Sequence, residues 1–90
     1  MSGILVYTKS HCPYCKAAKA LLEAHGATFR EIEISHDVVL RREMIARSGR
    51  HTVPQVFIGD RHVGGFDDLS ELDREGGLAP LLAALGTASA

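Results

Sequence analysis

The most constraining feature of the sequence is Cys12-Pro13-Tyr14-Cys15, which contains both cysteines of the chain. An apolar, β-branched stretch (4–8) precedes it, and a stretch rich in Ala, Leu, Lys and Glu (16–24) follows it. The first pattern is typical of a strand and the second of a helix, with proline well tolerated at the first helical position. Cys12 is therefore expected at the helix N-terminus, where unpaired N–H groups and the dipole face its sulfur. Cys15 follows one turn later, within reach of a disulfide.

A cysteine pair of this kind predicts redox chemistry. Zinc is disfavoured because a structural site usually needs four ligands, and the chain has neither a second cysteine pair nor a His-x3–5-His spacing. The formal net charge of -1 gives no reason to expect nucleic acid as a partner. No apolar run approaches the ~18 residues of a membrane span, and the N-terminus lacks a signal-peptide pattern. We therefore expect a cytoplasmic protein with no membrane partner.

Patterning along the rest of the chain predicts an α/β fold. The expected elements are a strand at 4–8, a helix at 13–25 before Gly26, an edge strand at 29–34, a helix from Ser35 or Asp37 to Ser48, hairpin strands at 55–58 and 61–63, a helix capped by Asp67 or Asp68 with an Asp68–Glu71 capping box, and a short helix from near Pro80. Strand–helix–strand order implies a parallel pair, and the hairpin adds two antiparallel strands. The chain is expected to form a single domain (1–90), one mixed sheet with helices on both faces, with a frayed tail at about 86–90.

Two further motifs each allow a purely structural and a functional interpretation. In Thr52-Val53-Pro54 the proline could simply open a strand, where no ladder donor is needed. Gly64-Gly65-Phe66-Asp67-Asp68 could be a strand end followed by a helix cap. Alternatively, its glycines let a small molecule approach exposed N–H groups while a carboxylate meets a cation.

Together these motifs carry a family resemblance. Tyr7-Thr8-Lys9, Cys12-Pro13-Tyr14-Cys15, Thr52-Val53-Pro54-Gln55 and Gly64-Gly65-x-Asp67-Asp68 occur in the order and spacing of dithiol glutaredoxins, and the chain resembles that family over residues 4–82. Ser48-Gly49-Arg50 and Gly76-Gly77-Leu78 look most like the bacterial glutaredoxin-3 branch. The resemblance implies a thioredoxin-like fold with a four-stranded sheet in the order 2-1-3-4. It also implies a cis bond before Pro54 and glutathione as reductant.

The resemblance further implies an enzyme that reduces protein disulfides and glutathione mixed disulfides. Cys12 matches the nucleophile and Cys15 the resolving thiol. The positions matching glutathione contacts are Lys9, Tyr14, Thr52, Val53, Pro54, Gly65, Asp67 and Asp68. The partners implied are glutathione, as co-substrate, and disulfide-containing or glutathionylated proteins. A monomer without a metal is expected. The role of His11 stays open, because it could act electrostatically on Cys12 or simply be an exposed loop histidine. The role of Phe66 also stays open, because it could form a wall of the groove or pack in the core.

The expected site is a clamp for the charged ends of glutathione. The γ-glutamyl carboxylate should meet N–H groups at the start of the third helix, and an aspartate near them should accept the ammonium. The glycine carboxylate should lie toward Lys9, with Tyr14 along the groove wall.

Two alternatives differ in function. The first is a thioredoxin-like electron carrier recharged by a flavoprotein reductase, against which Asp67 and Asp68 argue. The second is a dimeric iron–sulfur carrier with Cys12 and glutathione as ligands, which Pro13 disfavours by stiffening the loop and Cys15 by competing for the site.

Overall fold

The structure, a computed structural model, describes residues 3–85. Its elements are β1 (Ile4–Thr8), α1 (Pro13–Ala24), β2 (Arg30–Glu33), α2 (Val38–Ser48), β3 (Gln55–Ile58), β4 (Arg61–Gly64), α3 (Phe66–Arg74) and α4 (Leu78–Ala84). The predicted order of strands and helices is confirmed, and the element ends shift by only a few residues. The tail expected to fray, 86–90, lies outside the described residues. No helix within 3–85 is long and apolar enough to cross a membrane.

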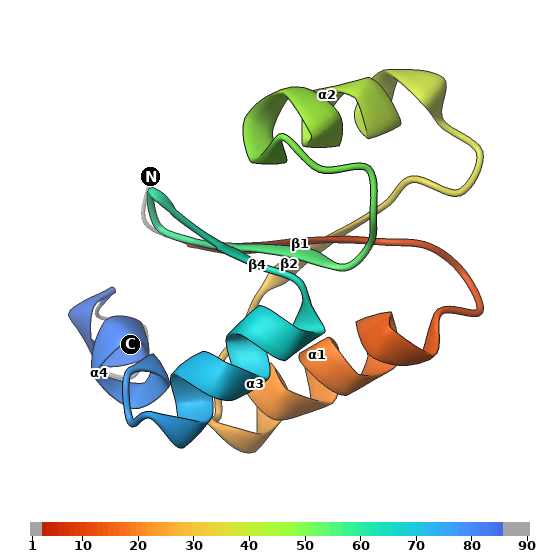
Figure 1. Cartoon of the computed structure of the whole chain (residues 1–90). Coiled ribbons are helices and arrows are strands. Elements are labelled where there is room, and N and C mark those ends of the chain that lie inside the picture. The colour runs from red at the N-terminus through yellow and green to blue at the C-terminus, as the bar shows by residue number, and fades with distance from the viewer. Residues whose placement is uncertain (1–2, 86–90) are drawn as a thin grey trace.

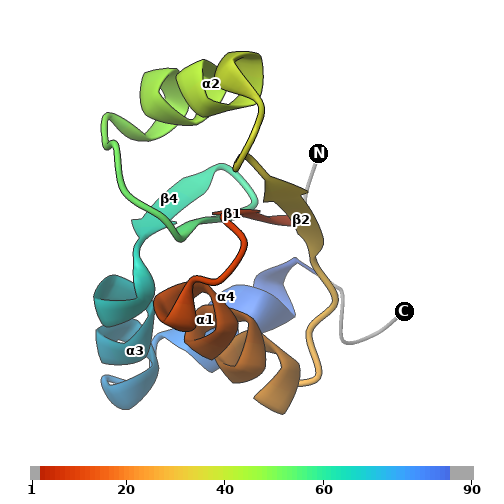
Figure 2. The same cartoon turned by 90° about the vertical axis from the view of Figure 1, so that its right-hand side faces the viewer.

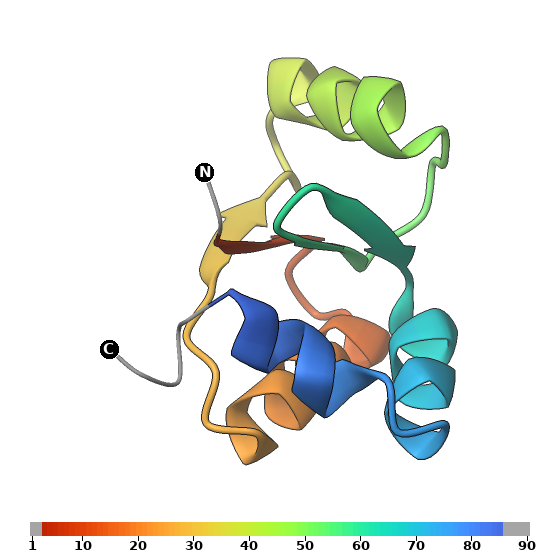
Figure 3. The same ribbon diagram turned by 90° about the vertical axis from the view of Figure 1, so that its left-hand side faces the viewer.

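The four strands form one mixed sheet in the order β2-β1-β3-β4, as expected. β1 pairs with β2 in parallel, whereas the β1–β3 and β3–β4 pairs are antiparallel. Helix α2 covers one face of the sheet, and α1, α3 and α4 lie on the other (Figures 1 and 2). Figure 3 shows α4 beneath the sheet, on the same side as α1 and α3. This is the thioredoxin-like arrangement, and β2 is an edge strand as predicted.

The core has two halves because alternate residues of a strand point to opposite faces. Val6 of β1 packs with α1, α3 and α4, and its neighbour Tyr7 packs with Met44 of α2 and Phe57 of β3. The buried Tyr7 hydroxyl donates to Glu43 and accepts from Arg47 Nη1 at 3.0 Å, so α2 is held to the sheet by polar contacts as well. The pKa of Tyr7 is raised, mainly by burial and also by the Glu43 carboxylate, so this hydroxyl stays protonated and remains a donor.

Two expectations about helix starts are wrong. Neither Asp67 nor Asp68 caps α3, because the N-cap is Gly65. The Asp68 carboxylate instead reaches back from the first turn and accepts the Gly65 N–H at 2.9 Å, so the expected pairing with Glu71 is not the one formed. Helix α4 begins at Leu78 rather than near Pro80, since proline fits a first turn whose N–H groups have no intrahelical partner. For α2 the structure selects Asp37, whose carboxylate accepts the Leu40 N–H at 2.9 Å.

Candidate active site

Cys12 occupies the N-cap of α1, as the sequence predicts. Its extended backbone turns the sulfur toward the first helical turn, where it accepts the Cys15 N–H at 3.2 Å. The half-buried side chain remains reachable from solvent. The sulfur thus faces the positive end of the helix dipole. Just before it, His11 has a left-handed backbone (φ 58°) in the exposed loop from β1.

Cys15 differs sharply from Cys12 although it is only one helical turn away. Its side chain is 1% exposed. Burial, first, and its contact with Cys12 raise the pKa of the Cys15 thiol to about 12. Both cysteines are free thiols in this structure. At neutral pH Cys15 is therefore a protonated, shielded thiol behind the accessible sulfur of Cys12.

A groove of about 370 Å³ opens between the first turn of α1, the loop before β3 and the start of α3. It is lined by Tyr14, Arg50, Thr52, Val53, Pro54, Gly65, Phe66, Asp67 and Asp68. All predicted glutathione positions are therefore brought together except Lys9, which is exposed between β1 and α1 and does not line the groove.

The groove walls come from different parts of the chain. The Val53–Pro54 bond is cis, as expected. Tyr14 is 63% exposed, and its ring lies 6.3 Å from the Phe66 ring, so these two aromatic residues form one wall. This placement answers the open question about Phe66, which lines the groove while also packing against the core.

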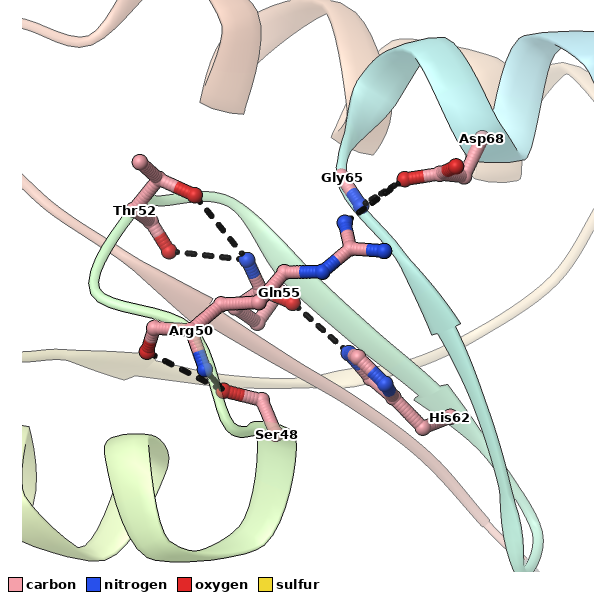
Figure 4. Close-up of polar contacts among 7 residues, drawn as sticks. All are labelled: Ser48, Arg50, Thr52, Gln55, His62, Gly65 and Asp68. Atoms are coloured by element: carbon pink, nitrogen blue, oxygen red, sulfur yellow. Dashed lines mark hydrogen bonds and ion pairs between the residues drawn. The ribbon is translucent and has the colours of Figure 1, made fainter.

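Arg50 is the groove residue that was missed as a site residue. Its Nη1 contacts Asp68 Oδ2 at 2.9 Å, and the same carboxylate oxygen accepts the Gly65 N–H (Figure 4). The pKa of Asp68 lies below its usual range, mainly because of the hydrogen bond from Arg50 and also because of the one from the Gly65 N–H. Its position in the sequence could have identified it, because Arg50 is a cation directly after Gly49, the glycine that ends α2.

Ser48 fixes the backbone of Arg50. Its hydroxyl oxygen accepts the Arg50 N–H at 3.0 Å and also lies 2.7 Å from the carbonyl of Met44 (Figure 4 shows the Arg50 side). The guanidinium therefore extends across the groove from a tied position.

Comparison with known proteins decides the family. The glutaredoxin family model matches residues 4–63, which is well over half of the chain. The chain belongs to the glutaredoxin family. It is 55% identical to glutaredoxin 3 of Escherichia coli K12 over 91% of this chain and 99% of that protein. A glutaredoxin of Pseudomonas aeruginosa is 46% identical over 93% of this chain and 100% of its own length. The predicted likeness to the glutaredoxin-3 branch is confirmed.

Solved glutaredoxins have the same fold. A crystal structure of a buckwheat glutaredoxin–glutathione complex superimposes with a TM-score of 0.87 at 34% identity, covering 96% of this chain and 81% of that one. A solution structure of a glutaredoxin from Brucella melitensis gives a TM-score of 0.80 at 55% identity, covering 91% and 89%. Family and geometry together make this protein a glutathione-dependent thiol–disulfide oxidoreductase with Cys12 and Cys15 side by side.

We expect the two thiols to react very differently with iodoacetamide. At pH 7 a short pulse should label Cys12 and leave Cys15 unlabelled, because only thiolates react readily and Cys15 is buried with a pKa of about 12. Peptide mass spectrometry measures both sites in one sample. Protein unfolded in urea is the control, in which both cysteines should be labelled. Comparable labelling of the two in folded protein would contradict this account of Cys15.

Gly64 is expected to be indispensable to the groove. Its φ is +118°, and a Cβ there would collide with the Asp68 carboxylate and lie 3.1 Å from Arg50 Nη1. Gly64→Ala should therefore cost about 1–3 kcal/mol of unfolding free energy and separate the Arg50–Asp68 pair. Gly76→Ala is the matched control, since Gly76 also has positive φ (+79°) but a Cβ there meets nothing within 4 Å. Urea titration compares them, and equal losses would show that collision adds nothing.

Proposed function

We propose that the protein reduces glutathione mixed disulfides and protein disulfides through Cys12, with glutathione as co-substrate in the groove beside it. The observation that carries this proposal is the groove, which starts at Tyr14 in the active-site turn and ends at the first turn of α3. Cys12 itself does not line the groove, but Tyr14, which lies between the two cysteines, does, and the groove carries the charged side chains of Arg50, Asp67 and Asp68. The glutathione complex of the buckwheat relative supports the choice of ligand.

In the first reaction the Cys12 thiolate attacks the glutathione sulfur of a mixed disulfide. A Cys12–glutathione disulfide forms, and the substrate leaves as a thiolate that takes a proton from solvent. A second glutathione thiolate then attacks the glutathione sulfur bound to Cys12. Oxidised glutathione forms, Cys12 leaves as a thiolate, and the two electrons have come from glutathione. Throughout this exchange the Cys12 sulfur stays at the helix N-terminus, where the Cys15 N–H points at it.

A protein disulfide requires the second cysteine. Cys12 attacks one sulfur of the substrate, releasing the other as a thiolate. Cys15 then passes its proton to solvent and attacks Cys12, which forms the Cys12–Cys15 disulfide and frees the second substrate thiol. Two glutathione molecules reduce that disulfide in turn and leave as oxidised glutathione. Since the pKa of Cys15 is raised to about 12, loss of its proton is the demanding part of this step.

The charges in the groove allow a refined assignment of the ends of glutathione. The unpaired N–H groups in the first turn of α3 suit the γ-glutamyl carboxylate. Asp68 already holds Arg50 and the Gly65 N–H, whereas no side chain in the described part of the chain pairs with Asp67. Asp67 is therefore the acceptor for the ammonium group. Arg50, with donors left over from its contact with Asp68, is the groove cation for the glycine carboxylate.

This assignment predicts separate effects on binding and on reactivity. Asp67→Asn and Arg50→Met should each raise the glutathione KM about tenfold, or ~1.4 kcal/mol, because each removes one charge-assisted contact. The rate at which iodoacetamide alkylates Cys12 should stay unchanged. Lys9→Met, outside the groove, tests the earlier expectation directly and should have the smaller effect. Asp60→Asn, in the exposed β3–β4 turn, is the control. An unchanged KM in both groove variants would refute the clamp.

The expectations about metal binding, oligomeric state and cellular location remain proposals that rest on the sequence. Among residues 3–85 there is no group of three or more His, Cys, Asp or Glu side chains placed to hold a metal ion. The iron–sulfur alternative is tested by visible absorbance after anaerobic purification in the presence of glutathione. We further propose a cytoplasmic monomer, which cell fractionation and size-exclusion chromatography would test.

A further inference from the structure

Behind the groove, one fully buried polar side chain connects the loop before β3 with strand β4. Gln55, the first residue of β3, is 0% exposed. Its amide nitrogen contacts the Thr52 carbonyl at 3.0 Å and Thr52 Oγ1 at 3.2 Å. Its amide oxygen lies 2.7 Å from Nε2 of His62 in β4 (Figure 4). Both ends of a buried amide are therefore satisfied, and Thr52 is linked to His62 through it.

The hydrogen bonds that link Thr52, Gln55 and His62 can be assigned donors and acceptors in only one consistent way. The Thr52 carbonyl can only accept, so the Gln55 nitrogen faces it and the Gln55 oxygen faces His62. His62 must then carry a hydrogen on Nε2, which is true of the protonated ring and of one neutral tautomer. Thr52 Oγ1 accepts from Gln55, which leaves its own hydrogen free. Thr52 is exposed and lines the groove, so this hydrogen is available to a ligand there.

His62 is held in place from both sides. Its ring lies 4.8 Å from the Phe57 ring at an interplanar angle of 33°. The pKa of His62 is lowered, mainly by burial and also by the charge of Arg50, while the charge of Asp68 acts in the opposite direction. The ring is thus mostly neutral near pH 7, and its Nε2 hydrogen is present in either charge state. His62 itself is not among the residues that line the groove.

We propose that His62 and Gln55 are positioning residues for the glutathione site, acting through a hydrogen-bond chain, centred on the buried Gln55, that fixes the Thr52 hydroxyl as a donor into the groove. This inference rests on the proposed function, because the acceptor is a carbonyl or carboxylate oxygen of bound glutathione. Without the His62 donor, the buried Gln55 oxygen has no partner, and the cost of that unsatisfied group favours a shift of the side chain that weakens its contacts with Thr52. The Thr52 hydroxyl is then no longer held with its hydrogen directed into the groove.

The decisive variant is His62→Phe, which keeps an aromatic ring against Phe57 and removes the donor. The glutathione KM should rise about fivefold with kcat unchanged, the effect of one neutral hydrogen bond. His62→Gln, whose amide nitrogen stands in for Nε2, should bring the KM back to within about twofold of the unmutated protein. His36→Phe, at an exposed histidine before α2, is the control for the chemical change alone.

A double-mutant cycle shows whether the effect passes through Thr52. Thr52→Val should raise the KM by itself, and adding His62→Phe to it should change nothing further. Additive effects, or a loss of kcat equal to the rise in KM, would overturn the proposal. Saturable dependence of the unmutated protein on glutathione tests the proposed function separately. If that dependence is present while His62→Phe behaves like the unmutated protein, only this inference fails.

A measurement on the unmutated protein covers the case in which a variant does not fold. Long-range ¹H–¹⁵N NMR correlations identify which ring nitrogen of His62 carries the hydrogen. The hydrogen-bond chain from His62 through Gln55 to Thr52 requires a hydrogen on Nε2 of His62 near pH 7. A neutral ring protonated on Nδ1 would overturn it.

Discussion

Replacing Cys12 with serine is expected to remove all thiol–disulfide exchange. The only other sulfur nucleophile is Cys15, which is 1% exposed and has a thiol pKa of about 12. A serine hydroxyl at the helix N-terminus is not ionised and forms no disulfide. Turnover of a protein–glutathione mixed disulfide should fall to the uncatalysed rate. Catalysis above that rate in Cys12→Ser would mean that Cys15 is reached by substrate, which the buried position argues against.

The fold of Cys12→Ser should survive, which makes the loss of activity interpretable. Serine is a preferred N-cap residue, and its oxygen replaces the sulfur that now accepts the Cys15 N–H. Circular dichroism and the urea midpoint should therefore match those of the unmutated protein. A large fall in stability would show that the sulfur contributes more to the turn than its hydrogen bond.

Cys15→Ser is expected to separate the two reactions. Reduction of glutathione mixed disulfides needs one thiol on the enzyme and should persist. Reduction of protein dithiol disulfides should fall close to background, because nothing then resolves the mixed disulfide between Cys12 and the substrate. The same preparation is assayed on a glutathionylated protein and on a protein with an internal disulfide. Equal losses on the two substrates would rule out this division of labour.

Much of the fold was predictable because local signals agreed with one another. Ile4–Thr8 has the composition of a buried strand, Pro13 begins a helix, and Gly49 ends one with a left-handed backbone. Strand–helix–strand order then restricted the topology. The cysteine site followed from the same local signals, since an N-cap sulfur depends only on the turn that carries it.

The groove was only partly predictable because its contacts join residues distant in sequence. Arg50 and Asp68 meet across it, and neither residue alone signals the other. The proposed ammonium role of Asp67 depends on Asp68 already being paired with Arg50, a distinction that two adjacent aspartates do not reveal in a sequence. Lys9 was placed from the resemblance, but the loop after β1 leaves it outside the lining.

The Gln55–His62 chain was hidden for a related reason. Gln55 follows the active-site proline and could have pointed to either face of β3, and His62 belongs to the other strand of the hairpin. Their contact depends on the β3–β4 register, which is irregular between Val56 and Phe57. A sequence pattern gives the hairpin but not this offset.

The most direct test of the central claim is the source of electrons. Turnover on a protein disulfide is measured with glutathione plus glutathione reductase, and in parallel with thioredoxin reductase, each coupled to NADPH oxidation. We predict sustained turnover with glutathione, saturating in glutathione concentration, and none above background with thioredoxin reductase. Efficient recharging by thioredoxin reductase, with no dependence on glutathione, would contradict the account.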